Sequence, residues 1–150
     1  TDPVVGEFQQ GDNRSGEVPV RAASNGPVTT VLVRQLGDDG SWSVLGASTE
    51  QIVPTTPAAG ATVTSPAQLA GTSTAFEGTV QVAVHGRVAG DPLGTGFVTG
   101  GSMGDMAPFD STVEFSAPTT DDGSIVFTTV SMEDGRVWEA AVVPVAFGAS

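Results

Sequence analysis

The feature that most constrains this chain is the lack of any stretch suited to a long helix. No window of about 11 residues combines an apolar period of 3.6 with freedom from glycine and proline. The 150 residues include 20 Gly and 10 Pro, and also 22 Val and 18 Thr, whose β-branched side chains favour strands. The sequence therefore predicts an all-β protein with many short strands and frequent turns.

The first 49 residues predict a small antiparallel β-meander, either complete or the remainder of a larger domain. Its last two strands would form a hairpin around Asp38-Asp39-Gly40, because Asp and Gly tolerate the positive φ of tight turns. Four short strands bury little apolar surface, so we expect them to pack beside another element. The expected strands are Val4–Phe8, Glu17–Ala22, Val28–Leu36 and Ser41–Gly46.

Residues 50–150 predict a second domain of about seven strands. Prolines make residues 48–60 an entry segment with at most a short strand at Ile52–Val53. Beyond it, valines 80, 82 and 84 share one face of a strand. The number and spacing of strands predict an immunoglobulin-like β-sandwich. The expected strands are Thr62–Thr64, Gln68–Ser73, Gly78–His85, Leu93–Thr99, Ser111–Ala117, Ser124–Ser131 and Val137–Phe147.

The last strand does not alternate simply, because Trp138 and Ala140 have one parity while Val143 and Val145 have the other, together with Glu139. A one-residue bulge near Ala140-Ala141 would turn both apolar sets inward and Glu139 outward. Trp138 is then expected to pack in the core. Phe76 and Phe109 are also expected to anchor the core, since each lies at the entry to a strand.

Several short motifs in the second segment are similar to a known family. They occur in the order Thr62-Val63-Thr64-Ser65-Pro66, Leu69-Ala70-Gly71-Thr72-Ser73, Ala75-Phe76-Glu77-Gly78-Thr79-Val80, Ala107-Pro108-Phe109, Val113-Glu114-Phe115 and Ser131-Met132-Glu133-Asp134-Gly135-Arg136. Residues of about 52–147 resemble the immunoglobulin-like domain of bacterial spore germination proteins. The resemblance implies a β-sandwich, an extracytoplasmic location, frequent attachment to a lipoprotein or cell-wall protein, and no catalytic residues.

Charge and composition exclude several classes of function. The net charge is −12, with five arginines and no lysine, so we expect neither nucleic acid nor an anionic membrane surface as a partner. The lack of lysine also removes Schiff-base chemistry, and no apolar run reaches the ~18 residues of a membrane helix. With no cysteine there is no disulfide or thiolate metal site.

The remaining candidates for chemistry are few. His85 is the one histidine, so a hydrolase would need it to converge with carboxylates in a cleft, and a surface position is expected instead. The acidic turns Asp38-Asp39-Gly40, Asp121-Asp122-Gly123 and Glu133-Asp134-Gly135 offer oxygen ligands for calcium, but they fit the geometry of turns better. We predict no catalytic residue, no cofactor and no metal site.

These patterns predict a non-enzymatic, extracytoplasmic binding or structural module of the bacterial cell envelope. Its partner would be a protein or a cell-wall component, bound through loops or through exposed strand edges. One alternative is a carbohydrate-binding module, in which Trp42 and Trp138 stack on sugar rings. A hydrolase is the other alternative.

Overall fold

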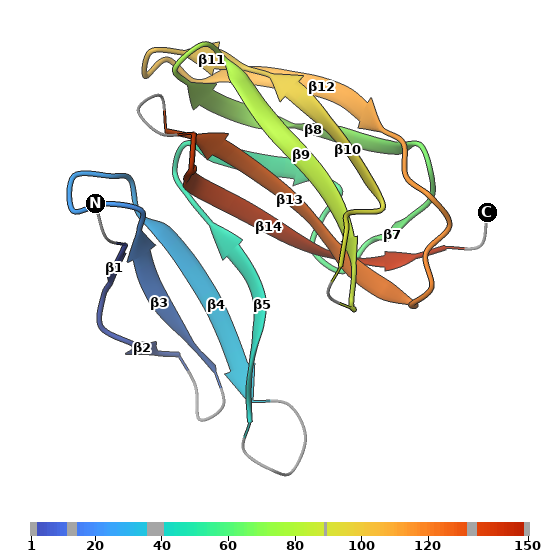
Figure 1. The fold of residues 1–150 in the computed structure, drawn as a ribbon, viewed down its shortest axis with the longest axis horizontal. Coiled ribbons are helices and arrows are strands. Elements are labelled where there is room, and N and C mark those ends of the chain that lie inside the picture. Colours follow the sequence, from blue (N-terminus) through green and yellow to red (C-terminus); the bar gives the residue numbers. More distant parts are fainter. Residues whose placement is uncertain (1–2, 12–14, 36–40, 89, 132–134, 149–150) are drawn as a thin grey trace.

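The computed structural model describes residues 3–11, 15–35, 41–88, 90–131 and 135–148. Within these residues the chain forms strands and turns and no helix (Figure 1), as the sequence predicts. The strands are β1 (Val4–Val5), β2 (Gln9–Gln10), β3 (Ser15–Arg21), β4 (Thr29–Gln35), β5 (Trp42–Ser48), β6 (Ile52–Thr56), β7 (Thr62–Val63), β8 (Ala67–Ala75), β9 (Thr79–Gly86), β10 (Gly94–Thr99), β11 (Gly101–Ser102), β12 (Ala107–Val113), β13 (Asp122–Val130) and β14 (Val137–Phe147).

The strands form two sheets that face each other as a sandwich. The larger sheet has the order β1-β3-β4-β5-β14-β13-β9-β10, with β2 beside β3 and β7 beside β14. In the smaller sheet β8 pairs with β6, β12 and the short β11. Leu69 of the small sheet and Val84 and Phe127 of the large one are fully buried, and the rings of Phe109 and Phe127 lie 5.9 Å apart. The immunoglobulin-like sandwich is therefore confirmed.

The N-terminal meander continues the larger sheet and does not stand apart from it. Strand β5 reaches β14 through the registered pair Ala47 and Val142. A second link is the backbone N–H of Ala140, which donates to Thr29 Oγ1 at 3.2 Å. Beyond that point β5 diverges from β14 (Figure 1), and Pro144 offers no N–H there while its carbonyl accepts from Gly60. We call this narrow junction of β3, β4 and β5 with β14 the seam.

Two strands of the sandwich differ from the prediction by three residues or more at one end. Strand β12 spans Ala107–Val113, whereas the sequence suggested Ser111–Ala117. Strand β6 continues past Val53 to Thr56 although it contains Pro54. Both prolines, Pro54 and Pro108, lie on strands that flank β8, where a missing N–H can face away from the ladder.

The prediction for the bulge in β14 is wrong, both in where the bulge lies and in the expectation that Glu139 faces outward. The register with β13 runs without a break from Ala146 to Glu139, which pairs with Thr129, and then shifts so that Val130 pairs with Val137. Trp138 is thus the extra residue. Because no bulge intervenes at Ala140-Ala141, Glu139 keeps the parity of Val145 and faces inward, where it is 3% exposed.

The two phenylalanines predicted as core anchors have opposite outcomes. Phe109 is 3% exposed and contacts Phe127, so that prediction is confirmed. Phe76 is 54% exposed, so its assignment to the core is wrong. Its position explains the difference, because Phe76 follows the end of β8 and lies in the turn before β9, beyond the facing sheet.

Candidate functional site

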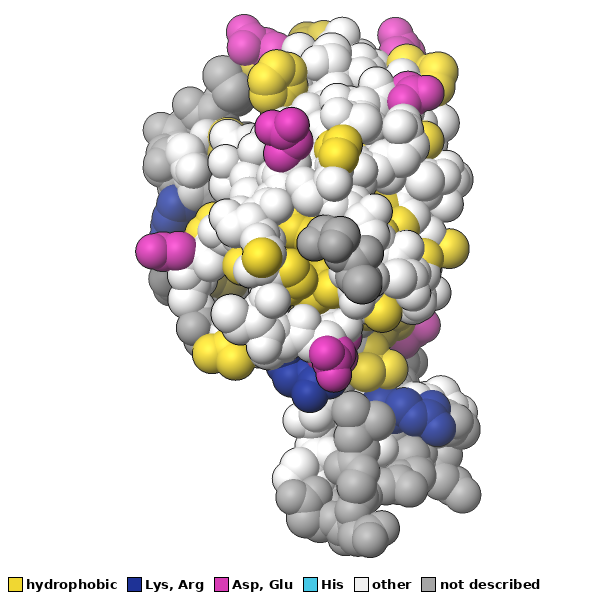
Figure 2. Space-filling model, turned by 90° about the vertical axis from the view of Figure 1, so that its right-hand side faces the viewer, with side chains coloured by type: hydrophobic (Ala, Val, Ile, Leu, Met, Phe, Trp, Pro, Cys, Tyr) yellow, Lys and Arg dark blue, Asp and Glu magenta, His cyan; other side chains and the backbone are white. Residues whose placement is uncertain are grey.

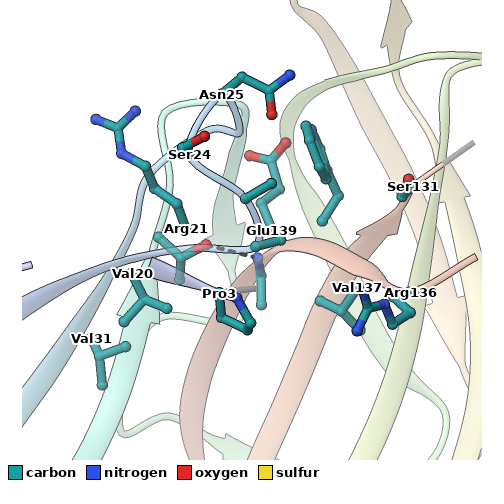
Figure 3. Close-up of a pocket in the computed structure, with 15 residues that line it drawn as sticks. Pro3, Val20, Arg21, Ser24, Asn25, Val31, Ser131, Arg136, Val137 and Glu139 are labelled. Atoms are coloured by element: carbon teal, nitrogen blue, oxygen red, sulfur yellow. Dashed lines mark hydrogen bonds between the residues drawn. The ribbon is translucent and has the colours of Figure 1, made fainter. Parts of the chain in front are cut away.

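A cavity of about 660 Å³ lies at the seam, between the meander and the start of β14 (Figure 3). We call it the seam cavity. One wall comes from the end of β3 and the loop that follows it, and the other from Ser131 and the start of β14. The lining residues are Pro3, Val20, Arg21, Ala22, Ala23, Ser24, Asn25, Thr29, Val31, Ser131, Arg136, Val137, Trp138, Glu139 and Ala140.

The bulge and a tight turn together shape this cavity. Because Trp138 is the bulged residue, its indole leaves the core and stands half-buried in the cavity wall. The opposite turn is closed by the Gly26 N–H, which donates to the Ala23 carbonyl at 2.9 Å. A Cβ on Gly26 would lie 3.4 Å from Trp138 Cη2, which is an ordinary van der Waals distance, so the indole packs directly against this turn. Trp138 was predicted to be a core residue, and the structure corrects this.

Glu139 is a buried acid at the inner wall of the cavity. Its Oε1 accepts from the Thr49 hydroxyl at 2.5 Å and its Oε2 from the Thr129 hydroxyl at 3.5 Å. Burial raises the pKa of Glu139 above its ordinary value, and the two hydroxyl bonds partly offset this by favouring the charged form. The seam therefore holds a buried carboxyl group whose charged form is favoured by its two hydroxyl donors.

Two arginines lie at the exposed mouth of the seam cavity. Arg21 ends β3 and donates from Nη1 to the Gly26 carbonyl at 3.4 Å, and Arg136 directly precedes β14. Figure 3 places them on opposite sides of Glu139. A guanidinium has five N–H donors, so the bond to Gly26 leaves Arg21 able to bind a further acceptor.

A second cavity of about 390 Å³ lies beside the first and shares Ser131, Trp138 and Glu139 with it. Exposed Phe76 and Met103 contribute apolar surface to it. The indole of Trp138 therefore belongs to the walls of both cavities. Phe76, which was assigned to the core from the sequence, lies at the surface here.

The two tryptophans do not form one sugar-binding platform. Trp42 is 46% exposed and packs edge-on against Phe8, with ring centroids 5.4 Å apart. It pairs with Gln35 at the end of β4, whereas Trp138 lies near Thr29 at its beginning. Six residues of strand separate the two sites by about 20 Å.

Strand pairing places His85 next to the acidic turn Asp121-Asp122-Gly123, because Gly86 pairs with Gly123. His85 is half-buried on β9 opposite Ser124 and lines none of the cavities described above. Asp122 forms an ion pair with Arg87 at 2.5 Å, and this contact raises the pKa of Arg87. The other two acidic turns, Asp38-Asp39-Gly40 and Glu133-Asp134-Gly135, include residues outside the described part of the chain. Within the described part, no three His, Cys, Asp or Glu residues cluster in a way that could hold a metal ion.

One hydrolase-type pattern escaped the sequence reasoning: Gly100-Gly101-Ser102-Met103-Gly104 matches G-x-S-x-G. In a nucleophile elbow this pattern joins a strand to a helix. Here Ser102 ends the two-residue strand β11, and the Asp105 N–H donates to its carbonyl at 3.0 Å in a turn. Ser102 lies near Ala75 and thus at the start of β9, whereas His85 is near its end.

The sequence reasoning also missed the residues that make the seam cavity. Arg21 carries no motif, and its nearness to Trp138 depends on contacts between segments more than 100 positions apart. Glu139 did carry a signal, because it shares the parity of Val143, Val145 and Phe147. The predicted bulge at Ala140-Ala141 hides this signal, because it would turn Glu139 outward.

Comparison with known proteins gave one match. The family model described as the immunoglobulin-like domain of bacterial spore germination matches residues 51–136, which is more than half of the chain. Neither the curated proteins nor the solved structures gave a match. In the described residues there is also no helix with the length and apolar character needed to cross a membrane.

Proposed function

The chain belongs to the family of immunoglobulin-like domains of bacterial spore germination, and from this premise we propose that it is a non-enzymatic, extracytoplasmic binding module of the bacterial cell envelope. We place its binding site at the seam cavity. The partner is a protein or a cell-wall component. We also propose a division into an N-terminal segment, residues 1–49, and an immunoglobulin-like domain, residues 50–150.

The observation that carries this proposal is the seam cavity itself. Its volume of about 660 Å³ falls in the usual range for ligand pockets, and it lies where the meander joins β14. Its wall combines a half-buried indole with arginines and the small polar residues Ser24 and Asn25. Aromatic and arginine side chains are also those that dominate binding surfaces.

The character of the surface supports a role outside the cytoplasm. Figure 2 shows one face on which acidic side chains are scattered over a surface that is mostly uncharged. Charged residues make up 15% of the chain, and serine and threonine supply much of the polarity. A surface of this kind, with a net charge of −12, resists binding to polyanions such as nucleic acid.

The proposal is tested by filling the cavity without touching the core. Ser24 is exposed at the cavity, so Ser24→Trp blocks it, and Thr95→Trp on exposed β10 adds the same side chain elsewhere. Both variants and the unaltered protein are sedimented with purified peptidoglycan and used as bait in envelope extracts. We expect Ser24→Trp to lose a partner that Thr95→Trp retains. Equal retention by all three proteins would refute the seam cavity as the binding site.

A further inference from the structure

The second cavity, of about 390 Å³, differs in chemistry from the seam cavity, and we call it the aromatic cavity. Its lining includes Phe76, Met103 and Trp138, which supply two aromatic rings and a thioether. Within the described part of the chain, Glu139 is the one titratable residue in this lining. Residues 132–134, which lie outside that part, are Met, Glu and Asp, so they add no positive charge. The described wall thus combines aromatic rings with a single acid.

Glu139 is a buried acid whose described partners are hydroxyls and not cations. It is 3% exposed, and its two carboxylate oxygens accept from the hydroxyls of Thr49 and Thr129. Buried carboxylates are usually paired with a cation, because burial alone disfavours the charge. A carboxylate has about four acceptor positions, so two hydroxyls leave some of them unused. A bound cation would therefore supply the opposite charge that the described residues do not bring to this carboxyl group.

Hydrogen bonds hold the wall of the aromatic cavity in place around this acid. Thr49 Oγ1 lies 2.5 Å from Glu139 Oε1 and accepts from the Gln51 N–H at 3.4 Å. The Gln51 carbonyl accepts from the Thr74 N–H at 2.9 Å, and Thr74 Oγ1 accepts from the Gly104 N–H at 3.0 Å. These bonds connect the carboxyl group with the turn between β11 and β12, so the wall is built before any ligand arrives.

That turn holds Met103 in a backbone conformation that a methionine rarely adopts. Its φ is 54° and that of Gly104 is 92°, and the Asp105 N–H donates to the Ser102 carbonyl at 3.0 Å, as in a type I′ turn. Asn, Asp or Gly is usual at such positions. Met103 is 73% exposed beside the cavity and Phe76 is 54% exposed. Backbone strain of this kind is concentrated at functional sites, which supports a binding role for this end of the sandwich.

From this arrangement we propose that the aromatic cavity binds an organic ammonium ion, with its positive charge beside Glu139 and its alkyl groups against Phe76 and Trp138. Aromatic faces attract such cations, and a carboxylate adds to the attraction in a site shielded from water. The net charge of −12 also attracts cations to the surface. The primary ammonium of a peptide side chain and a quaternary ammonium share this chemistry. The site goes beyond the proposed function, which depends on the seam cavity.

Choline and 3,3-dimethylbutan-1-ol provide the test, because the two probes have nearly the same shape and differ in charge. The protein carries Trp42→Phe, so that the fluorescence of Trp138, a wall residue of the cavity, reports binding at constant ionic strength. We expect choline to bind about tenfold more tightly than the neutral alcohol. N-α-acetyllysine amide is titrated in parallel, and the tighter of the two ammonium ions identifies the source of the ligand.

Two pairs of variants locate the site. Glu139→Gln should weaken choline by about tenfold and leave the neutral alcohol unchanged. Glu114→Gln is the matched control, because it removes the same charge from an exposed position, and its effect should stay within about twofold. Phe76→Leu should weaken choline by about threefold to tenfold, whereas Phe97→Leu, at an exposed position on β10, should not weaken it. Since Phe76 is exposed, this second pair carries the test should Glu139→Gln lower the unfolding midpoint.

The proposal would be overturned if neither ammonium ion bound more tightly than the neutral alcohol. Equal effects of Glu139→Gln and Glu114→Gln, or of Phe76→Leu and Phe97→Leu, would overturn it as well. Ser24→Trp blocks the seam cavity and should leave choline binding unchanged, and a loss of binding in this variant would refute the aromatic cavity as the cation site. The retention test of the seam cavity does not use choline, so failure of either proposal leaves the other standing.

Discussion

The hydrogen bond between Thr49 and Glu139 joins the end of the meander to β14, and its removal should weaken the fold measurably. Thr49 is 9% exposed and Glu139 is 3% exposed, and the Thr49 Oγ1 lies 2.5 Å from Oε1 of the carboxyl group. The substitution Thr49→Val keeps the shape of the side chain and deletes the donor. The carboxyl group would then keep only the longer bond from Thr129 among those described.

A hydrogen bond to a charged group contributes about 1.5–3 kcal/mol, and the loss of its donor leaves a buried acceptor less satisfied. We therefore expect Thr49→Val to lower the free energy of unfolding by about 2 kcal/mol near neutral pH. For a chain of this size that corresponds to a fall of about 4–8 °C in Tm. Urea titration followed by tryptophan fluorescence, with calorimetry for Tm, would measure the change.

Thr129→Val is the matched control, because its hydroxyl reaches the same carboxyl group at 3.5 Å. Its deletion should cost less than that of Thr49, since hydrogen bonds weaken at such distances. The cost of Thr49→Val should also grow with pH. The hydroxyl bond favours the charged form, and without it the raised pKa of Glu139 rises further, so more stability is lost as pH increases through that pKa. Equal costs for both substitutions, or a cost of Thr49→Val that does not change with pH, would refute this reasoning.

Three other predictions test the core and the buried acid. Phe109→Ala should cost about 3–5 kcal/mol and Phe76→Ala less than about 0.5 kcal/mol by urea titration, because the first is buried and the second exposed; similar costs would contradict the burial of one and the exposure of the other. Burial raises the pKa of Glu139 in the folded wild type. The wild type therefore has its full stability below the ordinary carboxyl pKa and loses part of it as pH rises through the folded-state pKa, whereas Glu139→Gln has no group that titrates there. The stability of Glu139→Gln relative to wild type should then increase as pH rises above the ordinary carboxyl pKa, and a difference that stays flat from acid to neutral pH would argue against a buried acid. Gly71→Ala should cost about 1–3 kcal/mol, because its Cβ would meet the Val53 carbonyl and come within 2.8 Å of Phe109 Cζ; an unchanged unfolding midpoint would show that β6 and β8 are packed less closely.

The alternation of apolar and polar residues predicted which side chains of a single strand face the core. Val80, Val82 and Val84 are 0–2% exposed, as their alternation indicated, and Phe109 is buried. The same reasoning predicts β12 at Ser111–Ala117, which is too late, because the strand begins at Ala107 and includes Pro108, a residue tolerated on a strand that flanks β8.

The candidate site was harder to predict because it depends on how separate elements meet. The position of the bulge decides whether Trp138 or Glu139 faces the core, and the register with β13 fixes that position. No local pattern around Arg21 indicates that β3 ends beside β14. A charged residue with the parity of buried valines, such as Glu139, is nonetheless a usable signal of a buried polar site.

The single registered pair between β5 and β14 has a mechanical consequence. A force that pulls the meander as a whole away from the sandwich would meet, at the seam, the pair of Ala47 with Val142 and the bond from Ala140 to Thr29. The long ladder between β13 and β14 would have to break many pairs to yield. Tension across the chain would therefore open the seam first and leave the sandwich intact.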